Sequence, residues 1–575
     1  MKYHFTLPFG AEIHANGTTL FRIWAPSVDR VELAIDRSRR GMTREQGGWH
    51  ALAMPAPAGT RYQFVLPDGL HVPDPVSRMQ DKDVHGPSVV VDATEYDWQN
   101  WEWMGRPWHE AVVYEVHAGT MGGFRGIEEH LPELQRLGIT AIEIMPIADF
   151  PGRHNWGYDG VLPYAPDRAY GTPDELKSLI DAAHGLGIMV MLDVVYNHFG
   201  PDGAYLHVYA KPFFREDIKT PWGAAIDFRR QEVQQYFVQN ALYWLMEYRF
   251  DGLRFDAVHA ISEEDFLIEL AALIRRRLEP GRHVHLVLEH EGNRASLLGG
   301  PPRFDAQWAD DFHHCLHVLL TGENEGYYAD FQDATNQLAR VLAEGFAYQG
   351  EVTPHGGKPR GEPSADLPVT AFVMGLQNHD QIGNRAMGER LTRLAEPAAL
   401  NAATALLLLA PFIPMLFMGE EWASRSPFLY FTDHNKELAE AVREGRRAEF
   451  KHFSAFQDEA KRARIPDPNA PSTFAASIPE HSDAAHFDFV RRLLTLRRER
   501  IVPGIPGCRS AGAEAIGPGA VRAAWNMGNG RRLTLAINLG PEAVDPAMPA
   551  GDPLFATPDA APDQLGPAAF IAHLA

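Results

Sequence analysis

The segment from about residue 110 to residue 420 constrains the fold most, because short apolar runs alternate there with longer amphipathic runs. The apolar runs have the length of buried parallel strands: 112–116, 141–145, 188–195, 252–259, 284–288, 305–308, 371–376 and 413–418. Amphipathic helices are expected at 127–137, 173–186, 231–248, 262–278 and 487–500. Repeated strand–helix units predict an α/β fold, a (β/α)₈ TIM barrel with its chemistry at the carboxyl ends of the strands.

The two ends of the chain have a different pattern. Short alternating runs broken by Pro, Asp and Gly predict an N-terminal β-sandwich over 1–95, comparable to a carbohydrate-binding module. The turn at 526–530 joins two further alternating runs, which predicts a hairpin in a small C-terminal β domain. We therefore expect three domains, 1–95, 96–500 and 501–575, with the catalytic barrel in the middle.

Charge and cysteine content exclude several classes of partner. A formal net charge of -22 argues against nucleic acid and acidic membrane surfaces, because both call for basic patches. No apolar run is long enough to span a bilayer, and the first residues lack the apolar region of a signal peptide. Cys315 and Cys508 are the only cysteines, which excludes a disulfide framework and favours a reducing, cytoplasmic compartment.

Polar side chains gather just after most of the predicted strands. They are His117, Asn197, His198, Asp256, His259, Glu289, Asp310, Asp311, His313, His314, Asn378, His379, Asp380, Glu420 and Glu421. Any one of them could be a hydrogen-bonding residue at the barrel rim. So many at the same end of different strands predict a functional site.

Arg254 and Asp256 place charge in a strand that is otherwise apolar. Two residues apart, they point to the same side of the strand, and the guanidinium stabilises the ionised carboxylate. For an isolated pair of this kind, a structural ion pair is the more frequent explanation. An ionised, oriented carboxylate is also the nucleophile that covalent glycosyl transfer needs. The other residues of the site decide between these two explanations.

Two further carboxylates complete an apparatus for glycoside hydrolysis. Glu289 follows the apolar run 286–288, and an apolar setting favours the protonated form that a general acid needs. Glu291 is a rival for that role. Asp380 is placed to bind sugar hydroxyls, as are His198 and His379.

No cofactor and no metal site are predicted. The His-rich segment 312–314 has no partner set at ligand spacing. Asn197 lies near Asp193, yet no acidic loop completes a Ca²⁺ site. We expect the chemistry to come from the protein's own side chains.

Four of these stretches resemble the signature strands of the α-amylase superfamily, glycoside hydrolase family 13. They are Asp-Val-Val-Tyr-Asn-His at 193–198, Gly-Leu-Arg-Phe-Asp at 252–256, Glu289, and Asn-His-Asp at 378–380. The resemblance implies that Asp256 is the nucleophile, Glu289 the acid/base catalyst and Asp380 the stabiliser of the transition state. It also implies a central subsite lined by Arg254, His198, His379 and Tyr158.

Within the superfamily, the stretches 256–261, 308–314, 378–386 and 431–434 are similar to malto-oligosyltrehalose trehalohydrolases. That resemblance implies a malto-oligosyltrehalose substrate, free trehalose as product and malto-oligosyltrehalose synthase as pathway partner. It implies recognition of the substrate by the loops after the later strands, with His259, Asp311, His313, His314, Gln381 and Asn384 as candidate contacts. The segments 117–123 and 290–293 depart from the family pattern.

Three functions are compatible with the sequence. The first is a retaining hydrolase that releases trehalose, and the second is a glucan-branching transglycosylase or another hydrolase with the same core. The third is a catalytically silent, carbohydrate-binding relative. Retention of Asp256, Glu289 and Asp380 together argues against the third, and the similarities outside the signature strands favour the first.

Overall fold

The centre of the molecule is a closed barrel of parallel strands, as the strand–helix alternation predicts. The computed structural model describes residues 1–575. The barrel strands follow one another in chain order around the barrel. They are β10 (Val113–Val116), β11 (Ala141–Ile144), β14 (Met189–Val194), β17 (Gly252–Phe255), β18 (His285–Leu288), β19 (Ala306–Trp308), β20 (Phe372–Gly375) and β21 (Ile413–Phe417).

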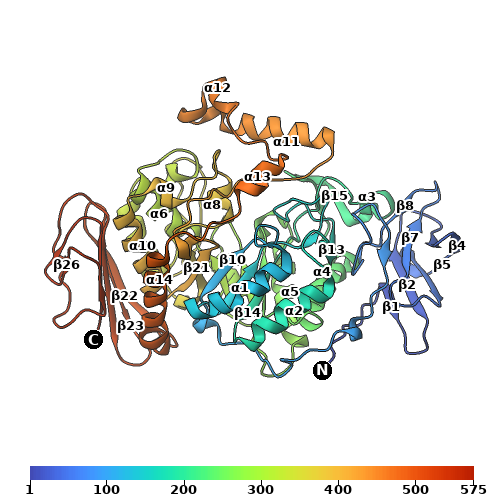
Figure 1. Cartoon of the computed structure of the whole chain (residues 1–575), viewed down its shortest axis with the longest axis horizontal. Coiled ribbons are helices and arrows are strands. Elements are labelled where there is room, and N and C mark those ends of the chain that lie inside the picture. The colour runs from blue at the N-terminus through green and yellow to red at the C-terminus, as the bar shows by residue number, and fades with distance from the viewer.

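Helices cover the outside of the barrel (Figure 1). The longer ones are α1 (Gly123–Leu137), α2 (Pro173–Gly185), α4 (Gln231–Met246), α5 (Glu264–Arg277), α6 (Asp310–Thr321), α7 (Ala334–Glu344), α10 (Pro397–Leu409) and α14 (Ala484–Leu496). Gly138, with a φ of 110°, ends α1 where a stop is predicted. Helices α6 and α7 are not among the predicted elements. The start of α6 decides which of the side chains after β19 face the functional site.

Packed side chains fill the amino end of the barrel. Trp103 and Trp108 lie against an apolar cluster that includes Val113, Met191 and Met415. The indole N–H of Trp103 donates to the Asp251 carboxylate at 2.8 Å, and that of Trp108 donates to the Thr370 carbonyl at 2.9 Å. This end of the barrel is therefore closed by packed side chains.

Two small antiparallel sheets form the N-terminal region, as its alternating runs predict. One contains β1 (Gly10–Ile13), β2 (Thr19–Trp24), β6 (Trp49–Met54) and β5 (Thr43–Arg44). The other contains β4 (Ser38–Gly41), β3 (Glu32–Ile35), β7 (Arg61–Val65), β8 (His71–Val72) and β9 (Ser88–Val89). Figure 1 shows both at one side of the barrel.

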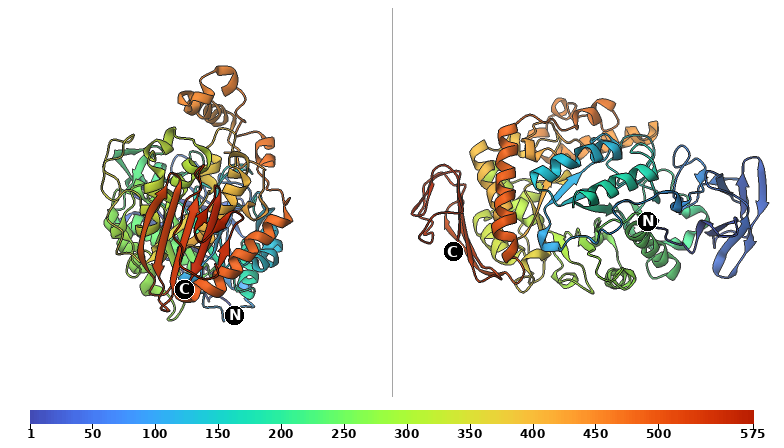
Figure 2. Two further views of the ribbon diagram at one scale, coloured as in Figure 1. Left: turned by 90° about the vertical axis from the view of Figure 1, so that its left-hand side faces the viewer. Right: turned by 60° about the horizontal axis from the view of Figure 1, so that its bottom comes forward.

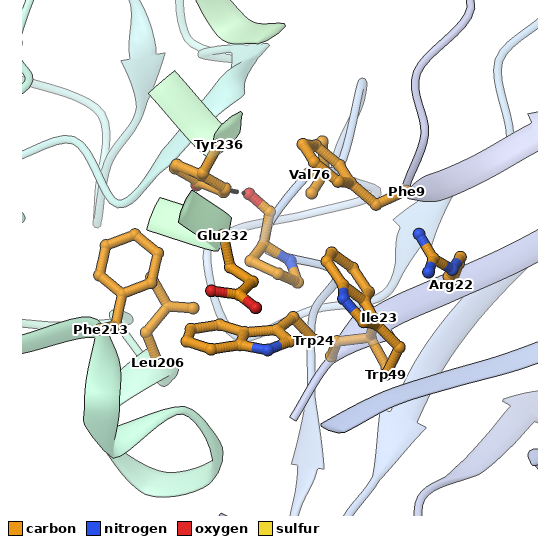
Figure 3. A pocket seen from close by; sticks show the side chains of 11 residues that line it. Phe9, Arg22, Ile23, Trp24, Trp49, Val76, Leu206, Phe213, Glu232 and Tyr236 are labelled. Carbon is orange, nitrogen blue, oxygen red and sulfur yellow. Dashed lines mark hydrogen bonds between the residues drawn. The ribbon is translucent and has the colours of Figure 1, made fainter. Parts of the chain in front are cut away.

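Aromatic side chains join this region to the barrel around a small crevice (Figure 3). Phe9 stacks on Trp49 within the N-terminal region, and its ring also packs against that of Tyr236 on α4, at 6.5 Å between centroids. A buried ion pair between Arg78 and Glu247, at 3.0 Å, adds a polar contact. The N-terminal sheets are therefore fixed to the barrel by packing as well as by the chain.

The main part of the C-terminal region is an antiparallel sheet at the other side of the barrel, with its strands side by side in Figure 2. Its strands are β22 (Arg509–Gly517), β23 (Ala520–Asn526), β24 (Arg532–Asn538), β28 (Ala569–Leu574) and β25 (Phe555–Ala556). Asn526 pairs with Arg532 across the turn at 526–530, so the predicted hairpin is confirmed.

Two insertions stand near the carboxyl end of the barrel. The hairpin β15 (Phe214–Thr220) and β16 (Gly223–Ile226) lies between β14 and α4. Helices α11 (Lys436–Glu449) and α12 (Glu459–Arg462) project from the body of the molecule at the top of Figure 1. None of the helices has the length and the apolar character that crossing a membrane requires.

Candidate active site

The guanidinium of Arg254 is the centre of the polar cluster at the carboxyl end of the barrel. Its Nη1 donates to Asp193 Oδ2 at 2.6 Å and to Asp256 Oδ1 at 2.9 Å, and its Nη2 donates to Glu289 Oε2 at 2.8 Å. Arg254 is fully buried and lies over the ring of Trp308, 4.0 Å from the ring centroid. One cation thus holds three carboxylates from neighbouring strands at fixed positions.

Asp256 has a second donor that helps to orient it. The side-chain amide of Asn197 donates to Asp256 Oδ2 at 2.9 Å and to its backbone carbonyl at 2.8 Å. Arg254 and Asn197 therefore hold different oxygens of the carboxylate, which fixes its plane. This is the arrangement that a positioned, ionised nucleophile needs.

Glu289 lies in a polar setting, which corrects the apolar environment expected after the run 286–288. Its Oε2 accepts from Arg254 and also from the backbone N–H of Ala257 at 2.8 Å. Ala257 can aim its N–H at Glu289 because it has left-handed backbone angles, with a φ of 40°. The sequence around Glu289 cannot show these donors, because both come from the end of the preceding strand.

Tyr158 and His198 close one side of the cluster. The Tyr158 hydroxyl donates to Asp193 Oδ2 at 2.8 Å, and its ring stacks on that of His379 at 5.1 Å between centroids. The Nε2 of His198 hydrogen-bonds to the Tyr158 carbonyl at 2.9 Å, and burial lowers the pKa of His198. A neutral imidazole is thereby favoured beside Asp256.

His379 and Asp380 stand at the start of the short helix α8 (His379–Gly383), where Asn378 caps the helix by accepting from the N–H groups of Asp380 and Gln381. Asp380 is the most open of the carboxylates, with 40 % of its side chain exposed. The side-chain amide of Asn384 donates to Asp380 Oδ1 at 3.1 Å. Asp380 is therefore positioned yet free to accept hydrogen bonds from a ligand.

His379 is expected to be positively charged in the folded protein. Burial opposes protonation, but the Asp380 and Glu115 carboxylates outweigh burial and raise the pKa of His379 to about 9. The stabilisation from this charge is present in full below about pH 6.5 and is lost as the pH rises through about 9, and it amounts to about 3 kcal/mol. We expect the difference in thermal midpoint between wild type and His379→Gln to shrink from pH 6 to pH 10. A difference that does not change with pH would contradict a charged His379.

Two of the predicted contacts, Asp311 and His313, lie outside the cluster. Asp311 is fully buried, and its carboxylate accepts from Asn293 at 2.9 Å, from the N–H of Ala347 at 2.8 Å and from Arg360 at 2.8 Å. His313 hydrogen-bonds to the Leu376 carbonyl and the Tyr328 hydroxyl, and burial lowers its pKa to about 3. The structure therefore gives Asp311 and His313 internal packing roles.

Of the other predicted contacts, His314 also lies in the interior, whereas His259 lies at the rim. The ring of His314 packs 4.8 Å from that of Phe331, and burial lowers its pKa well below the ordinary value. His259 stays at the rim with 32 % of its side chain exposed, 3.7 Å from Glu291. Glu291 is itself 81 % exposed and makes no contact with Arg254, which leaves Glu289 as the carboxylate within the cluster.

Asp310 is one of the polar side chains that follow the strands, but it is not among the predicted substrate contacts. It is the first residue of α6, and the side-chain amide of Gln381 donates to its Oδ1 at 3.0 Å. Burial and the charges of Glu289 and Asp380 raise the pKa of Asp310 to about 7. The helical periodicity of 310–321 would have indicated it, because successive residues of a helix point about 100° apart and only one of Asp310 and Asp311 can face the cluster.

The side chains of this region are not arranged as a metal site. No group of three or more His, Cys, Asp and Glu residues is placed to hold an ion. After β21, Glu420 accepts from Gln377 at 3.1 Å, and the buried Glu421 accepts from the Tyr114 hydroxyl at 2.7 Å. The geometry therefore offers carboxylate chemistry around Arg254, with an open carboxylate, Asp380, beside it.

Known proteins with related sequences point to the same chemistry. The family model for the alpha amylase catalytic domain matches residues 109–222, and that for a domain of unknown function (DUF3459) matches residues 508–571. A Deinococcus radiodurans protein named malto-oligosyltrehalose trehalohydrolase is 39% identical over 91% of this chain and 89% of its own length. The protein of the same name from Saccharolobus solfataricus is 40% identical over 77% of this chain and 80% of its own.

Two further matches bear on the alternatives. A 1,4-alpha-glucan branching enzyme of Corynebacterium jeikeium is 33% identical over only 45% of this chain and 40% of its own. A crystal structure from Salmonella typhimurium, of a protein provisionally named an alpha amylase, superimposes with a TM-score of 0.94. It is 44% identical and the match covers 99% of this chain and 100% of that one.

Proposed function

The chain belongs to the malto-oligosyltrehalose trehalohydrolase family of α-amylase-type glycoside hydrolases, and on that premise we propose the roles of its site residues. It is a glycosidase that acts on malto-oligosyltrehalose and releases trehalose. The observation that carries the role assignment is the bridging of Asp256 and Glu289 by the single guanidinium of Arg254. That bridge holds two carboxylates close to one another, which supports a retaining mechanism.

In the proposed reaction, Asp256 Oδ attacks the anomeric carbon of the glucose next to the trehalose unit. Glu289, protonated when substrate is bound, gives its proton to the glycosidic oxygen, so that the α-1,4 bond breaks and trehalose leaves. The ionised Glu289 then removes a proton from water, which attacks the same carbon and releases Asp256. Two inversions at one carbon give net retention, and each catalytic group returns to its starting state.

Asp380 would stabilise the positive charge and the distorted ring of the transition state, and His379 would donate a hydrogen bond to a hydroxyl of the same glucose. The open carboxylate of Asp380 suits hydrogen bonds to sugar hydroxyls, which strengthen as the ring flattens. His198 and Tyr158 would line the same glucose on its other side. Arg254 is fully buried, so it would hold Asp256 in place rather than contact the sugar, which corrects the expected lining role.

We place the trehalose unit of the substrate near Asp310, Gln381 and Asn384. Asp310 and Gln381 join α6 to α8 beside Asp380, and both carry polar atoms that a sugar hydroxyl can bind. A site of this kind discriminates because an ordinary reducing-end glucose would leave such groups unpaired. His259, with 32 % of its side chain exposed beside Glu291, completes the proposed set.

We also infer the source of the substrate and the cellular location of the protein. A malto-oligosyltrehalose synthase is the expected source of the substrate, because it makes the α,α-1,1 linkage that this chain would recognise. Both cysteines are free and buried, which is typical of proteins from reducing compartments and supports a cytoplasmic location.

Proton NMR of a reaction with maltotriosyltrehalose tests the proposed function. We expect free trehalose and maltotriose, with the α-anomer of maltotriose formed first, because the retaining mechanism preserves the configuration at the cleaved carbon. Amylose under the same conditions should give little product. Initial release of the β-anomer would contradict the role of Asp256, and release of glucose or maltose without trehalose would contradict the substrate.

A further inference from the structure

Glu143 is a buried carboxyl group that has no partner. It lies on β11, in register with Glu115 on β10 and with Met191 on β14, and only 2% of it is exposed. Its side chain takes part in no hydrogen bond and no ion pair, and Oε1 is completely buried. An isolated negative charge at such a position is strongly disfavoured.

The charged groups that face Glu143 come from four elements and are already engaged with one another. Glu115 on β10 is paired with His379 at the start of α8, and Asp193 on β14 is paired with Arg254 on β17. Burial and then the charge of Asp193 raise the pKa of Glu143 well above its ordinary value, against a smaller opposing effect of Arg254. The environment therefore favours the neutral carboxylic acid.

Asp193 has a buried carboxylate oxygen that lacks a hydrogen-bond donor. Its Oδ2 accepts from Arg254 at 2.6 Å and from Tyr158 at 2.8 Å, while its Oδ1 is buried without a donor. Asp193 lies two residues beyond Met191, the residue paired with Glu143, so the two carboxyls are diagonal neighbours on adjacent strands. Long side chains reach one another at that separation.

We propose that Glu143 is protonated at neutral pH and donates its O–H to Asp193 Oδ1, which makes it a positioning residue for the nucleophile. The bond satisfies both orphaned oxygens. By donating to Asp193 it also opposes burial, which raises the pKa of Asp193 to about 7, and so favours the charged form that pairs with Arg254. Arg254 in turn holds Asp256 at 2.9 Å. Glu143 touches no substrate, and its effect passes through Asp193 and Arg254.

Infrared difference spectroscopy tests the protonation state directly. The spectrum of wild type minus that of Glu143→Gln at pH 7 should contain the C=O stretching band of a protonated carboxylic acid. Glu420→Gln is the matched positive control, because burial raises the pKa of Glu420 to about 8 and its own band should disappear in the same way. A wild type without the Glu143 band, beside a visible Glu420 band, would overturn the proposal.

Kinetics test the positioning role, which rests on the proposed function. Glu143→Gln keeps a neutral N–H donor and should retain kcat within about threefold, whereas Glu143→Met has no donor and should lose about tenfold or more in kcat with KM little changed. The thermal midpoint of Glu143→Met should not fall, because an apolar side chain of similar size suits a buried site. Equal losses in the two variants would overturn the positioning role. If wild type failed to act on malto-oligosyltrehalose, the spectroscopic result would still decide the protonation of Glu143.

Discussion

Asp256→Asn should lose about 10⁴-fold or more in kcat on maltotriosyltrehalose. The amide keeps the shape of the carboxylate but cannot form the covalent glycosyl ester, so the first step of the reaction is lost. The fold should survive, because Arg254 still pairs with Asp193 and Glu289, and one cation then serves two carboxylates instead of three. Activity and the thermal midpoint are to be measured on the same preparation.

Asp545→Asn is a suitable control for that experiment, since Asp545 is an exposed carboxylate in the C-terminal region, far along the chain from the barrel strands. It should match wild type in both measurements. An Asp256→Asn variant that kept activity within about tenfold of wild type would remove Asp256 as the nucleophile.

Glu289→Gln should show the second largest effect, and the effect should depend on the leaving group. A sugar leaving group needs a proton, so kcat on maltotriosyltrehalose should fall about 10³-fold. α-Maltotriosyl fluoride needs no proton for departure, and formation of the glycosyl-enzyme from it should be much less affected. Rapid-quench measurement of the fluoride released in the first turnover separates the two steps.

Glu291→Gln is the matched control, because Glu291 lies two residues further on in an exposed position. It should stay close to wild type with both substrates. If Glu289→Gln lost equal activity on both, Glu289 would act on the structure of the site and not as the proton donor.

The barrel could be predicted because its signal is periodic and local. Runs such as 188–195 are apolar on both faces, and glycine stops such as Gly138 end the helices between them. The cluster around Arg254 could also be predicted, since parallel strands bring their carboxyl ends to one place. Which side chains face that place depends on the backbone after each strand.

In the segment 308–314, the sequence motif alone does not show which side chains face the site. Asp310, Asp311 and His313 are close in sequence, but the helix begins at Asp310 and turns Asp311 and His313 into the interior. A contact on such a segment can be assigned only when the first residue of the helix is known. The same holds for Glu289, whose donors come from Arg254 and from the left-handed conformation of Ala257.

The ratio of kcat/KM for maltotriosyltrehalose to that for maltopentaose tests the account most directly. Both substrates contain the same number of glucose units and differ only in the linkage at one end. The account predicts a preference of about 10²-fold or more for maltotriosyltrehalose, because groups near Asp310 and Gln381 would be left unpaired by a linear end. Equal values for the two substrates would contradict it and would indicate an ordinary α-amylase.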